Sequence, residues 1–365
     1  MAKRIAVTNL QANTIDIVNT IRANASAAYR DSIPVVTDLH DLRAVGEYFQ
    51  GYPQFANEFV SALVNRIAAV KVKSATFNNA YAKFKKGYLE FGETVEEVFV
   101  EIAKAREFSA EKAEAREFKR TLPDVRAAFH VMNWKVQYPV TIQNEDLRMA
   151  FTSFNGVEDL IAKIVGAVTV AAEYDEYLLF KYLLIKGINK GEILTQNVSV
   201  TDDKDLAVAF RGTSNLFTFI STKYNAEQVH TSTPRADQYI IMDANYNAKF
   251  DVNVLASAFN MDKADFMGRL ELIDDFTSFD NDRFDIIRQN SDMIEEVTSA
   301  ELTAMADIKA ILIDPEWFQV YDNLGAMTEK YVASGLYWNY FYNSWKTVSS
   351  SPFSNAVAFK AVAAQ

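Results

Sequence analysis

The chain has 365 residues, of which 49% are hydrophobic and 23% charged, and its formal net charge is −11. That length allows a sizeable buried core, and the negative charge argues against a general nucleic-acid binder, which needs a basic surface to neutralise phosphates. The absence of cysteine excludes disulfides and thiolate sites, and the 12 scattered glycines form no phosphate-cradling loop.

The N-terminal part is predicted to be a helical arm with breaks. Residues 14–28 carry apolar side chains at helical spacing, and Pro34 ends any helix nearby. Two more helical patterns cover residues 38–48 and 54–70, separated by a Gly-Tyr-Pro turn. These segments hold too few apolar residues to form a core by themselves.

The next part reads as a long two-stranded ribbon. Residues 70–75 and 98–103 alternate as strands with one wetter face, and the basic run Lys83-Phe84-Lys85-Lys86-Gly87 is expected at an irregular tip between them. A short charged helix is expected from Ser109 to about Lys119. Because a two-stranded ribbon is marginal alone in water, we expect something outside the chain to hold it. The alternatives are a hairpin folded back over its own domain and a solvated basic loop.

A strand over residues 125–142 is predicted to lead into a long amphipathic helix. Apolar residues recur at helical spacing from Leu147 to Leu178, with Asn144 as the cap, a break at Gly156 and a stop at Lys186 before Gly187. A continuous helix from residue 157 to 186 would span about 45 Å at roughly 1.5 Å per residue. We expect it to act as a beam for the rest of the fold.

The C-terminal half predicts a compact α+β domain followed by a buried strand. Strands are expected at 238–242, 269–273 and 309–313, and helices at 251–259 and 263–267. Residues 335–348 carry aromatic side chains on both faces, so both faces should be covered. The stretch 251–307 holds 14 acidic and 4 basic residues, which predicts a solvated acidic face.

The chain contains no recognisable catalytic, metal or cofactor motif. His40, His130 and His230 are isolated in sequence and predicted to be surface or hydrogen-bonded histidines. The acidic run between Asp274 and Asp285 departs from the calcium-loop pattern, although a hydrolase using these carboxylates remains an alternative. The longest apolar run, 160–172, is interrupted by Lys163, and we expect neither an export signal nor a membrane span.

Several short motifs follow one another in a characteristic order: Lys83-Phe-Lys-Lys-Gly, Thr94-Val-Glu-Glu, Asp251-Val-Asn-Val-Leu-Ala-Ser-Ala-Phe-Asn-Met, Asp265-Phe-Met-Gly, Asp322-Asn-Leu, Gly335-Leu-Tyr-Trp-Asn-Tyr and Asn355-Ala-Val-Ala-Phe. With these motifs the chain resembles the major capsid protein of small short-tailed bacteriophages of Gram-positive hosts, which have the Hong Kong 97-type shell fold. Some relatives continue past the Asn355 motif into an immunoglobulin-like surface domain, and we expect no role tied to that domain here.

The resemblance implies an α+β fold with five parts. They are an N-terminal arm at 1–63, an E-loop at 64–124, a peripheral domain with a spine helix at 125–191, an axial domain at 192–334, and a C-terminal return strand of the peripheral domain at 335–365. It also implies E-loop contacts between subunits, which we assign to Lys83, Phe84, Lys85 and Lys86.

The implied function is structural and not enzymatic. The subunit would self-assemble as pentamers and hexamers into an icosahedral head, with a scaffolding protein, a portal or connector and packaged double-stranded DNA as partners. That DNA would be held without sequence-specific binding, and the acidic stretch 251–307 would let it slide if it faces the lumen. No cofactor and no membrane are implied; the protein would be part of the virion, assembled in the host cytoplasm. The alternative is an encapsulin-like shell protein of a bacterial nanocompartment.

Overall fold

The structure is a computed structural model, and it describes residues 14–52, 54–56, 58, 59, 62, 79–89, 94–143, 156–200, 203–248, 269–289 and 291–363. Four predicted features therefore lie outside the described residues: the strand at 70–75, the cap at Asn144, and the helices at 251–259 and 263–267. The chain divides into two compact units. The first holds residues 1–79, 136–175 and 325–344, and the second holds 80–135, 176–324 and 345–365.

Three helices open the first unit: α1 (Thr14–Asn24), α2 (Ala27–Ser32) and α3 (Leu39–Gly51). The side chain of Ser26 caps α2 by accepting from the backbone of Tyr29, and Asp38 caps α3 by accepting from Asp41. These caps satisfy backbone donors that a helix start leaves unpaired. The predicted helical pattern at 38–48 is confirmed, whereas residues 14–28 form two helices separated at Ala25 and Ser26.

The core of the first unit joins these helices to two strands. Buried side chains of α1, α2 and α3 form one cluster with Ile142 of β3 (Val125–Gln143) and with Trp338 and Tyr340 of β9 (Tyr337–Ser350). Tyr29 lies in its middle, fully buried, with its ring 5.9 Å from that of Phe55. The expectation that the arm does not form a core by itself is therefore confirmed.

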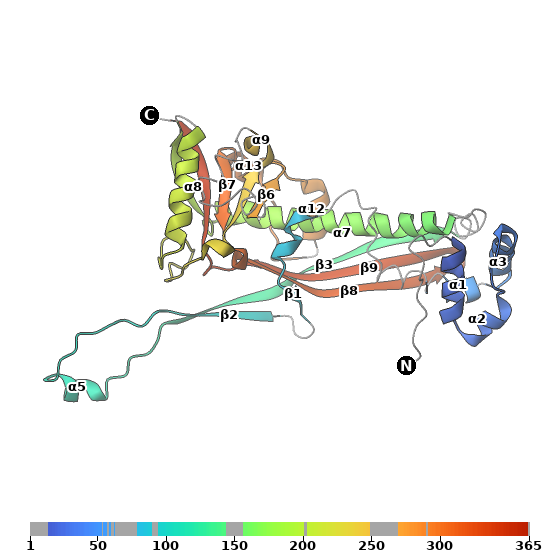
Figure 1. Cartoon of the computed structure of the whole chain (residues 1–365), viewed down its shortest axis with the longest axis horizontal. Helices are drawn as coiled ribbons and strands as arrows, with labels where there is room; N and C mark the ends of the chain where they lie inside the picture. The colour runs from blue at the N-terminus through green and yellow to red at the C-terminus, as the bar shows by residue number, and fades with distance from the viewer. Residues whose placement is uncertain are drawn as a thin grey trace. The chain divides into compact units, whose positions relative to one another are not determined.

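The longest helix is α7 (Gly156–Asn189), 34 residues long, drawn in green in Figure 1. The predicted long helix is confirmed, but its predicted end at Lys186 is wrong because Gly187 lies inside the helix. A Cβ atom at Gly187 would lie 2.9 Å from Cζ2 of Trp317, so glycine serves close packing at this position. Gly191, at φ +79°, follows the end of the helix, a position where glycine is favoured.

One five-stranded sheet has the order β1-β8-β9-β3-β2, where β1 is Gly87–Tyr88, β2 is Thr94–Val100 and β8 is Phe318–Val332. The predicted strands at 125–142 and 335–348 are confirmed as β3 and β9. Of the 14 residues of β9 only Trp345 is exposed, at 37%, as its aromatic residues on both faces predict.

The second sheet lies in the second unit and has the order β4-β10-β7-β5-β6. The predicted strands are confirmed as β5 (Tyr239–Asp243), β6 (Leu270–Ile273) and β7 (Ile308–Ile313). Two strands were not predicted: β4 (Leu194–Val200) and β10 (Ala356–Ala363), which pair in parallel. Residues 356–363 thus belong to this sheet, whereas β9 belongs to the first one. The grouping of 335–365 with the peripheral domain stays a prediction.

Helix α8 (Asp203–Phe217) packs its apolar side chains against this sheet. Leu206, Phe210 and Phe217 are buried with residues of β4, β5, β7 and β10 in one core cluster. Shorter elements complete the second unit: η1 (Ala80–Phe84), α5 (Ala113–Glu117), η2 (Arg235–Asp237), α9 (Ala244–Asn247), α12 (Asn281–Arg288), α13 (Ser299–Ala304) and η3 (Pro315–Trp317). No helix in the described part of the chain has the length and apolar character needed to cross a membrane.

Candidate assembly surface

A two-stranded ribbon in the second unit is formed by β2 and the first residues of β3. The strands pair antiparallel, from Thr94 opposite Val131 to Val100 opposite Val125. A long loop, 101–124, joins them and carries α5 at its far end (Figure 1). Part of the predicted strand at 98–103 lies in β2, which pairs with residues 125–131. Whether it also pairs with residues 70–75 stays a prediction, because that segment lies outside the described residues.

One face of this ribbon exposes apolar side chains. Val98 is 54% exposed, Val100 58%, Val125 51% and Phe129 63%. Val100 lies directly opposite Val125, Val98 is two residues before Val100, and Phe129 is four residues after Val125. Because side chains alternate along a strand, all four share one side of the ribbon. Such a surface is typical of a protein that meets a partner.

The opposite face is fastened to the second unit. Phe99 stacks on Phe353 with ring centroids 5.6 Å apart. His130 is 2% exposed, with Nδ1 2.9 Å from Ser349 Oγ and Nε2 3.1 Å from Glu97 Oε2. The other carboxylate oxygen of Glu97 accepts from Ser351 Oγ at 2.7 Å. The prediction that His130 is a hydrogen-bonded histidine is confirmed.

A second histidine fastens the base of the long loop. His230 Nδ1 lies 2.6 Å from Glu101 Oε1. Burial alone would raise the pKa of the Glu101 carboxyl. Hydrogen bonds from the backbone N–H groups of His230 and Ile102 outweigh this effect and hold the pKa below its usual value. Nearby, Arg126 donates to the backbone oxygen of Glu227 at 2.6 Å. One face of the ribbon therefore packs on and hydrogen-bonds with other residues of the second unit, whereas the apolar side chains of the other face are exposed to solvent.

The four residues predicted as subunit contacts lie elsewhere. Lys83 and Phe84 belong to η1, and Lys85 and Lys86 follow it. Phe84 is 2% exposed and stacks on Phe318 at 5.1 Å, and the ammonium of Lys83 lies 4.6 Å from the ring centre of Tyr239. The expected position at the tip of the ribbon is wrong, because Phe84 is drawn into the core of the second unit. Their role in contacts between subunits stays a prediction.

Each of the three lysines pairs with a carboxylate of the same unit. Lys83 pairs with Glu271, and Lys86 Nζ lies 2.7 Å from Glu316. Lys85 Nζ lies 2.5 Å from Asp322 and 3.0 Å from Glu176. The basic run is thus not a solvated loop.

Lys85 belongs to a cluster of two lysines and two carboxylates. Lys346 Nζ lies 2.5 Å from Glu176 Oε2 and 2.6 Å from Asp322 Oδ1. Burial opposes ionisation, but Lys346 and Lys85 together hold the pKa of Asp322 below its usual value. The sequence held a signal for this cluster: Lys346 is the only charged residue in a strand with aromatic residues on both faces.

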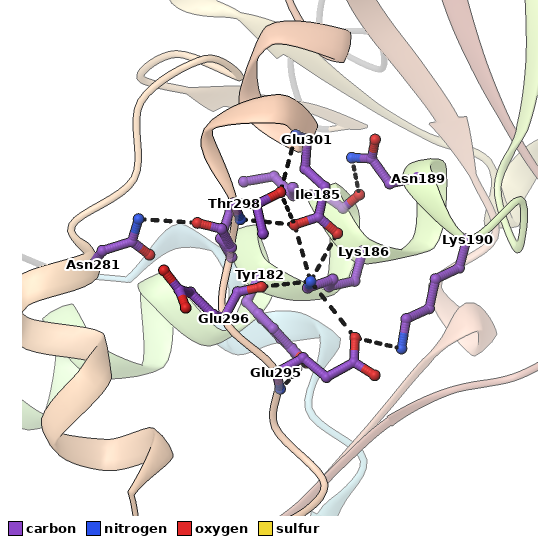
Figure 2. Close-up of polar contacts among 11 residues, drawn as sticks. Tyr182, Ile185, Lys186, Asn189, Lys190, Asn281, Glu295, Glu296, Thr298 and Glu301 are labelled. Carbon is purple, nitrogen blue, oxygen red and sulfur yellow. Dashed lines mark hydrogen bonds and ion pairs between the residues drawn. The ribbon is translucent and has the colours of Figure 1, made fainter.

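A third set of contacts fixes the C-terminal part of α7 (Figure 2). The buried ammonium of Lys186 donates to the backbone oxygen of Glu296 at 2.6 Å and to Glu301 Oε1 at 2.7 Å. Glu301 also forms a capping box with Thr298 at the start of α13. Lys190 reaches Glu295 at 3.0 Å. These contacts tie α7 to the segment that carries α13.

The carboxylates considered for catalysis serve the local structure. Asp274 pairs with Lys181 at 2.6 Å, Asp280 caps α12, and Asp285 pairs with Arg288 at 2.9 Å. Among the described residues, one group can offer three metal-ligating atoms within 4.8 Å of one another: Asp38, His40 and Asp41. His40 is exposed, as predicted for a surface histidine, and both aspartates already accept hydrogen bonds at the start of α3.

Comparison with known proteins gives consistent relatives. The family model of the Phi29-like phage major capsid protein matches residues 18–360. The major capsid protein of Bacillus phage B103 is 36% identical over 353 residues, which are 94% of this chain and 72% of that protein. That of Streptococcus phage Cp-1 is 32% identical over 289 residues, 74% of this chain and 78% of that protein.

Solved structures share the fold at low identity. The capsid structure of Staphylococcus phage Andhra gives a TM-score of 0.61 at 14% identity, covering 80% of this chain and 88% of that one. The mature capsid of bacteriophage PhiM1 gives 0.50 at 10% identity, covering 80% and 90%. The predicted α+β class is confirmed, with two sheets and with capsid proteins as structural neighbours. The family match over residues 18–360 shows that this chain belongs to the Phi29-like phage major capsid protein family.

Proposed function

We propose that this capsid subunit builds an icosahedral phage head around double-stranded DNA, and that the ribbon of each copy covers a neighbouring copy. The observation that carries the proposal is the exposed apolar face at Val98, Val100, Val125 and Phe129. The match to phage major capsid proteins favours the viral function over the encapsulin-like alternative.

The energetics suit an assembly of many weak contacts. Fully burying a Val or Phe side chain contributes roughly 1.5–3 kcal/mol, so covering four half-exposed side chains stabilises each contact by about 3–6 kcal/mol. That is modest for a single pair of proteins. Closed symmetry and several contacts per copy add up to a stable shell.

We assign the parts of the chain by the same proposal. Residues 1–63 act as the N-terminal arm, 64–124 as the E-loop, 125–191 as the peripheral domain with α7 as its spine helix, and 192–334 as the axial domain. The first strand residues of β3 complete the E-loop ribbon, and β10 completes the axial sheet. Pentamers and hexamers of these subunits form the shell.

Partners follow from the role in a head. We propose a scaffolding protein, a portal or connector and packaged DNA as partners, with assembly in the host cytoplasm. If the acidic stretch faces the lumen, like-charge repulsion keeps DNA mobile. Changing four exposed carboxylates to lysine, at Asp282, Asp292, Glu296 and Asp307, should then lower the DNA content of filled heads; unchanged filling would remove this part of the proposal.

The proposal is tested by a matched pair of double variants. V98S/F129S removes apolar area from the ribbon, and V208S/F219S makes the same changes on α8 and just beyond it, where Val208 is 70% and Phe219 67% exposed. Each variant is co-expressed with the scaffolding protein of the same virus, and particles are counted by electron microscopy. We expect shells to be lost only with V98S/F129S. Normal shells from it, or equal loss from both variants, would contradict the ribbon contact.

A further inference from the structure

The loop 101–124 contains a four-residue motif twice. Ala-Arg-Glu-Phe occurs at 105–108 and again at 115–118. The two phenylalanines are the most exposed large hydrophobic residues in the described part of the chain: Phe108 is 92% exposed and Phe118 is 89%. Two copies of one motif each present a phenyl ring to solvent.

The arginines of the two motifs hold the loop together from within. Arg106 Nη2 donates to Thr121 Oγ1 at 2.9 Å, and Arg116 Nη1 donates to the backbone oxygen of Glu107 at 2.9 Å. The first bond joins the two halves of the loop on either side of α5, and the second joins α5 itself to the first half. The loop is therefore shaped by its own polar contacts, while both rings stay outside them.

The charge of the loop distinguishes it from the rest of the chain. It carries 6 acidic and 6 basic residues, whereas the whole chain has a net charge of −11. Like charge repels two copies of an acidic protein, and a neutral segment approaches such a surface at lower electrostatic cost. This favours another copy of the chain as the partner of the loop.

We propose that Phe108 and Phe118 are paired anchors by which loop 101–124 docks onto a second copy of this chain. The inference rests on the proposed function, because it extends the apolar face of the ribbon along the same segment. Exposed aromatic rings that become buried at the centre of a contact commonly dominate its affinity. The loop itself is shaped in advance, which lowers the entropic cost of docking.

The absence of cysteine from the chain makes a thiol footprint specific. Single variants F108C, F118C and V98C, with F219C as the control, are treated with a maleimide as dissociated subunits and as assembled shells. We expect F108C and F118C to react readily in subunits and at least about tenfold more slowly in shells, as burial at a contact requires. F219C should react alike in both.

The labelling results distinguish a failure of the paired anchors from a failure of the ribbon contact. If V98C is protected in shells but F108C and F118C react as fast as in subunits, the paired anchors are overturned and the ribbon contact stands. If V98C also stays reactive, both fail. Slow reaction already in dissociated subunits would mean that the rings pack on their own chain, and protection lost when the scaffold leaves would assign them to the scaffold; either result overturns the inference.

Assembly of serine variants provides a second measurement that does not depend on labelling. F108S and F118S should each raise the subunit concentration needed for half-assembly by about tenfold or more, as loss of a buried ring predicts. F219S should leave it within about twofold. Unchanged assembly of F108S/F118S would overturn the paired anchors, whereas the V98S/F129S result reports on the ribbon contact alone.

Discussion

Two regions of the second unit differ in the kind of side chain that they bury. The C-terminal part of α7 buries charged groups, with Lys181 2% and Lys186 7% exposed. The ribbon and its loop leave apolar groups in water, among them Phe129 at 63%. The two buried lysines of the helix form ion pairs inside the chain, Lys181 with Asp274 and Lys186 with Glu301. The ribbon packs only one of its two faces against the same chain.

The difference separates two sources of stability. A buried lysine must be paired within the folded subunit, because an unpaired charge in the interior is strongly destabilising. A two-stranded ribbon is marginal by itself, and its exposed apolar face becomes useful when another molecule covers it. Substitutions in the first region should therefore unfold the subunit, and substitutions in the second should affect assembly.

The largest effect on folding is expected at the buried charge cluster. Lys346→Met leaves Glu176 and Asp322 with Lys85 as their shared cation, and we expect the free energy of unfolding to fall by about 3 kcal/mol. Lys360→Met is the control, because its 3.8 Å pair with Asp307 lies closer to solvent and should contribute less than about 1 kcal/mol. Urea unfolding of both variants measures the difference. Equal losses would contradict the view that the cluster acts through its burial.

A smaller loss is expected from Gly187→Ala. The new methyl group would lie 2.9 Å from Trp317 Cζ2 and 3.1 Å from Ile193 Cδ1, and overpacking of this kind costs about 1–3 kcal/mol. Gly212→Ala in α8 is the matched control, because nothing lies within 4 Å of its added Cβ. It should stabilise the chain by about 0.5–1 kcal/mol through helix propensity. Thermal unfolding of the pair should move in opposite directions, and a stabilised Gly187→Ala would refute the close packing of α7 on Trp317.

The pH dependence of stability should change with Asp322. Lys346 and Lys85 hold its pKa below the ordinary value of 3.8, so its contribution is complete above that value and is lost as the pH falls through it. Asp322→Asn should therefore flatten the loss of stability between about pH 5 and pH 3. Measurement is by urea unfolding at several pH values, and an unchanged acid slope would contradict the assigned pairing.

Asp314 is a control, because its pKa is shifted in the opposite direction from that of Asp322. Burial raises its pKa despite hydrogen bonds from Glu316 and Thr233. The folded chain therefore gains stability from this group as the pH falls toward the ordinary value of 3.8. Asp314→Asn should make the acid loss steeper. If the stability of both variants depended less steeply on pH, the flattening would not follow the directions of the two pKa shifts, and neither shift would explain it.

The smallest effect on folding is expected on the ribbon. Phe129→Ser should change the free energy of unfolding of the isolated subunit by less than about 0.5 kcal/mol, as is usual for exposed positions. The same substitution should reduce shell yield. A loss of several kcal/mol in the isolated subunit would mean that the ring packs on its own chain, and the contrast between the two regions would disappear.

The sequence predicted elements whose side-chain periodicity is strong and local. Helix α7 and strands β3 and β9 were found because each carries a long regular apolar pattern. Strand β4 was missed because Thr195, Gln196 and Asn197 make it largely polar. Strand β10 was missed because it is rich in alanine, and its parallel pairing with β4 joins residues more than 150 positions apart.

The candidate site was harder to predict because its partners are distant in sequence. The run Lys83 to Lys86 looked exposed by composition, yet the partners of Lys85 are Glu176 and Asp322, far along the chain. The pairing of β2 with β3 was not predicted, because the two strands are separated by the irregular loop 101–124. The marginal stability of the ribbon and its need for an outside partner stay predictions, which follow from its having no core of its own.

Hydrogen exchange of the subunit, alone and in assembled shells, tests most directly whether the ribbon is completed by a neighbour. Backbone amides of residues 177–189 in α7 should be protected in both states. Those of residues 94–124 should exchange quickly in the isolated subunit and become protected in the shell. If residues 94–124 are as protected in the isolated subunit as in the shell, or remain unprotected in both, the ribbon is not stabilised by a neighbouring copy.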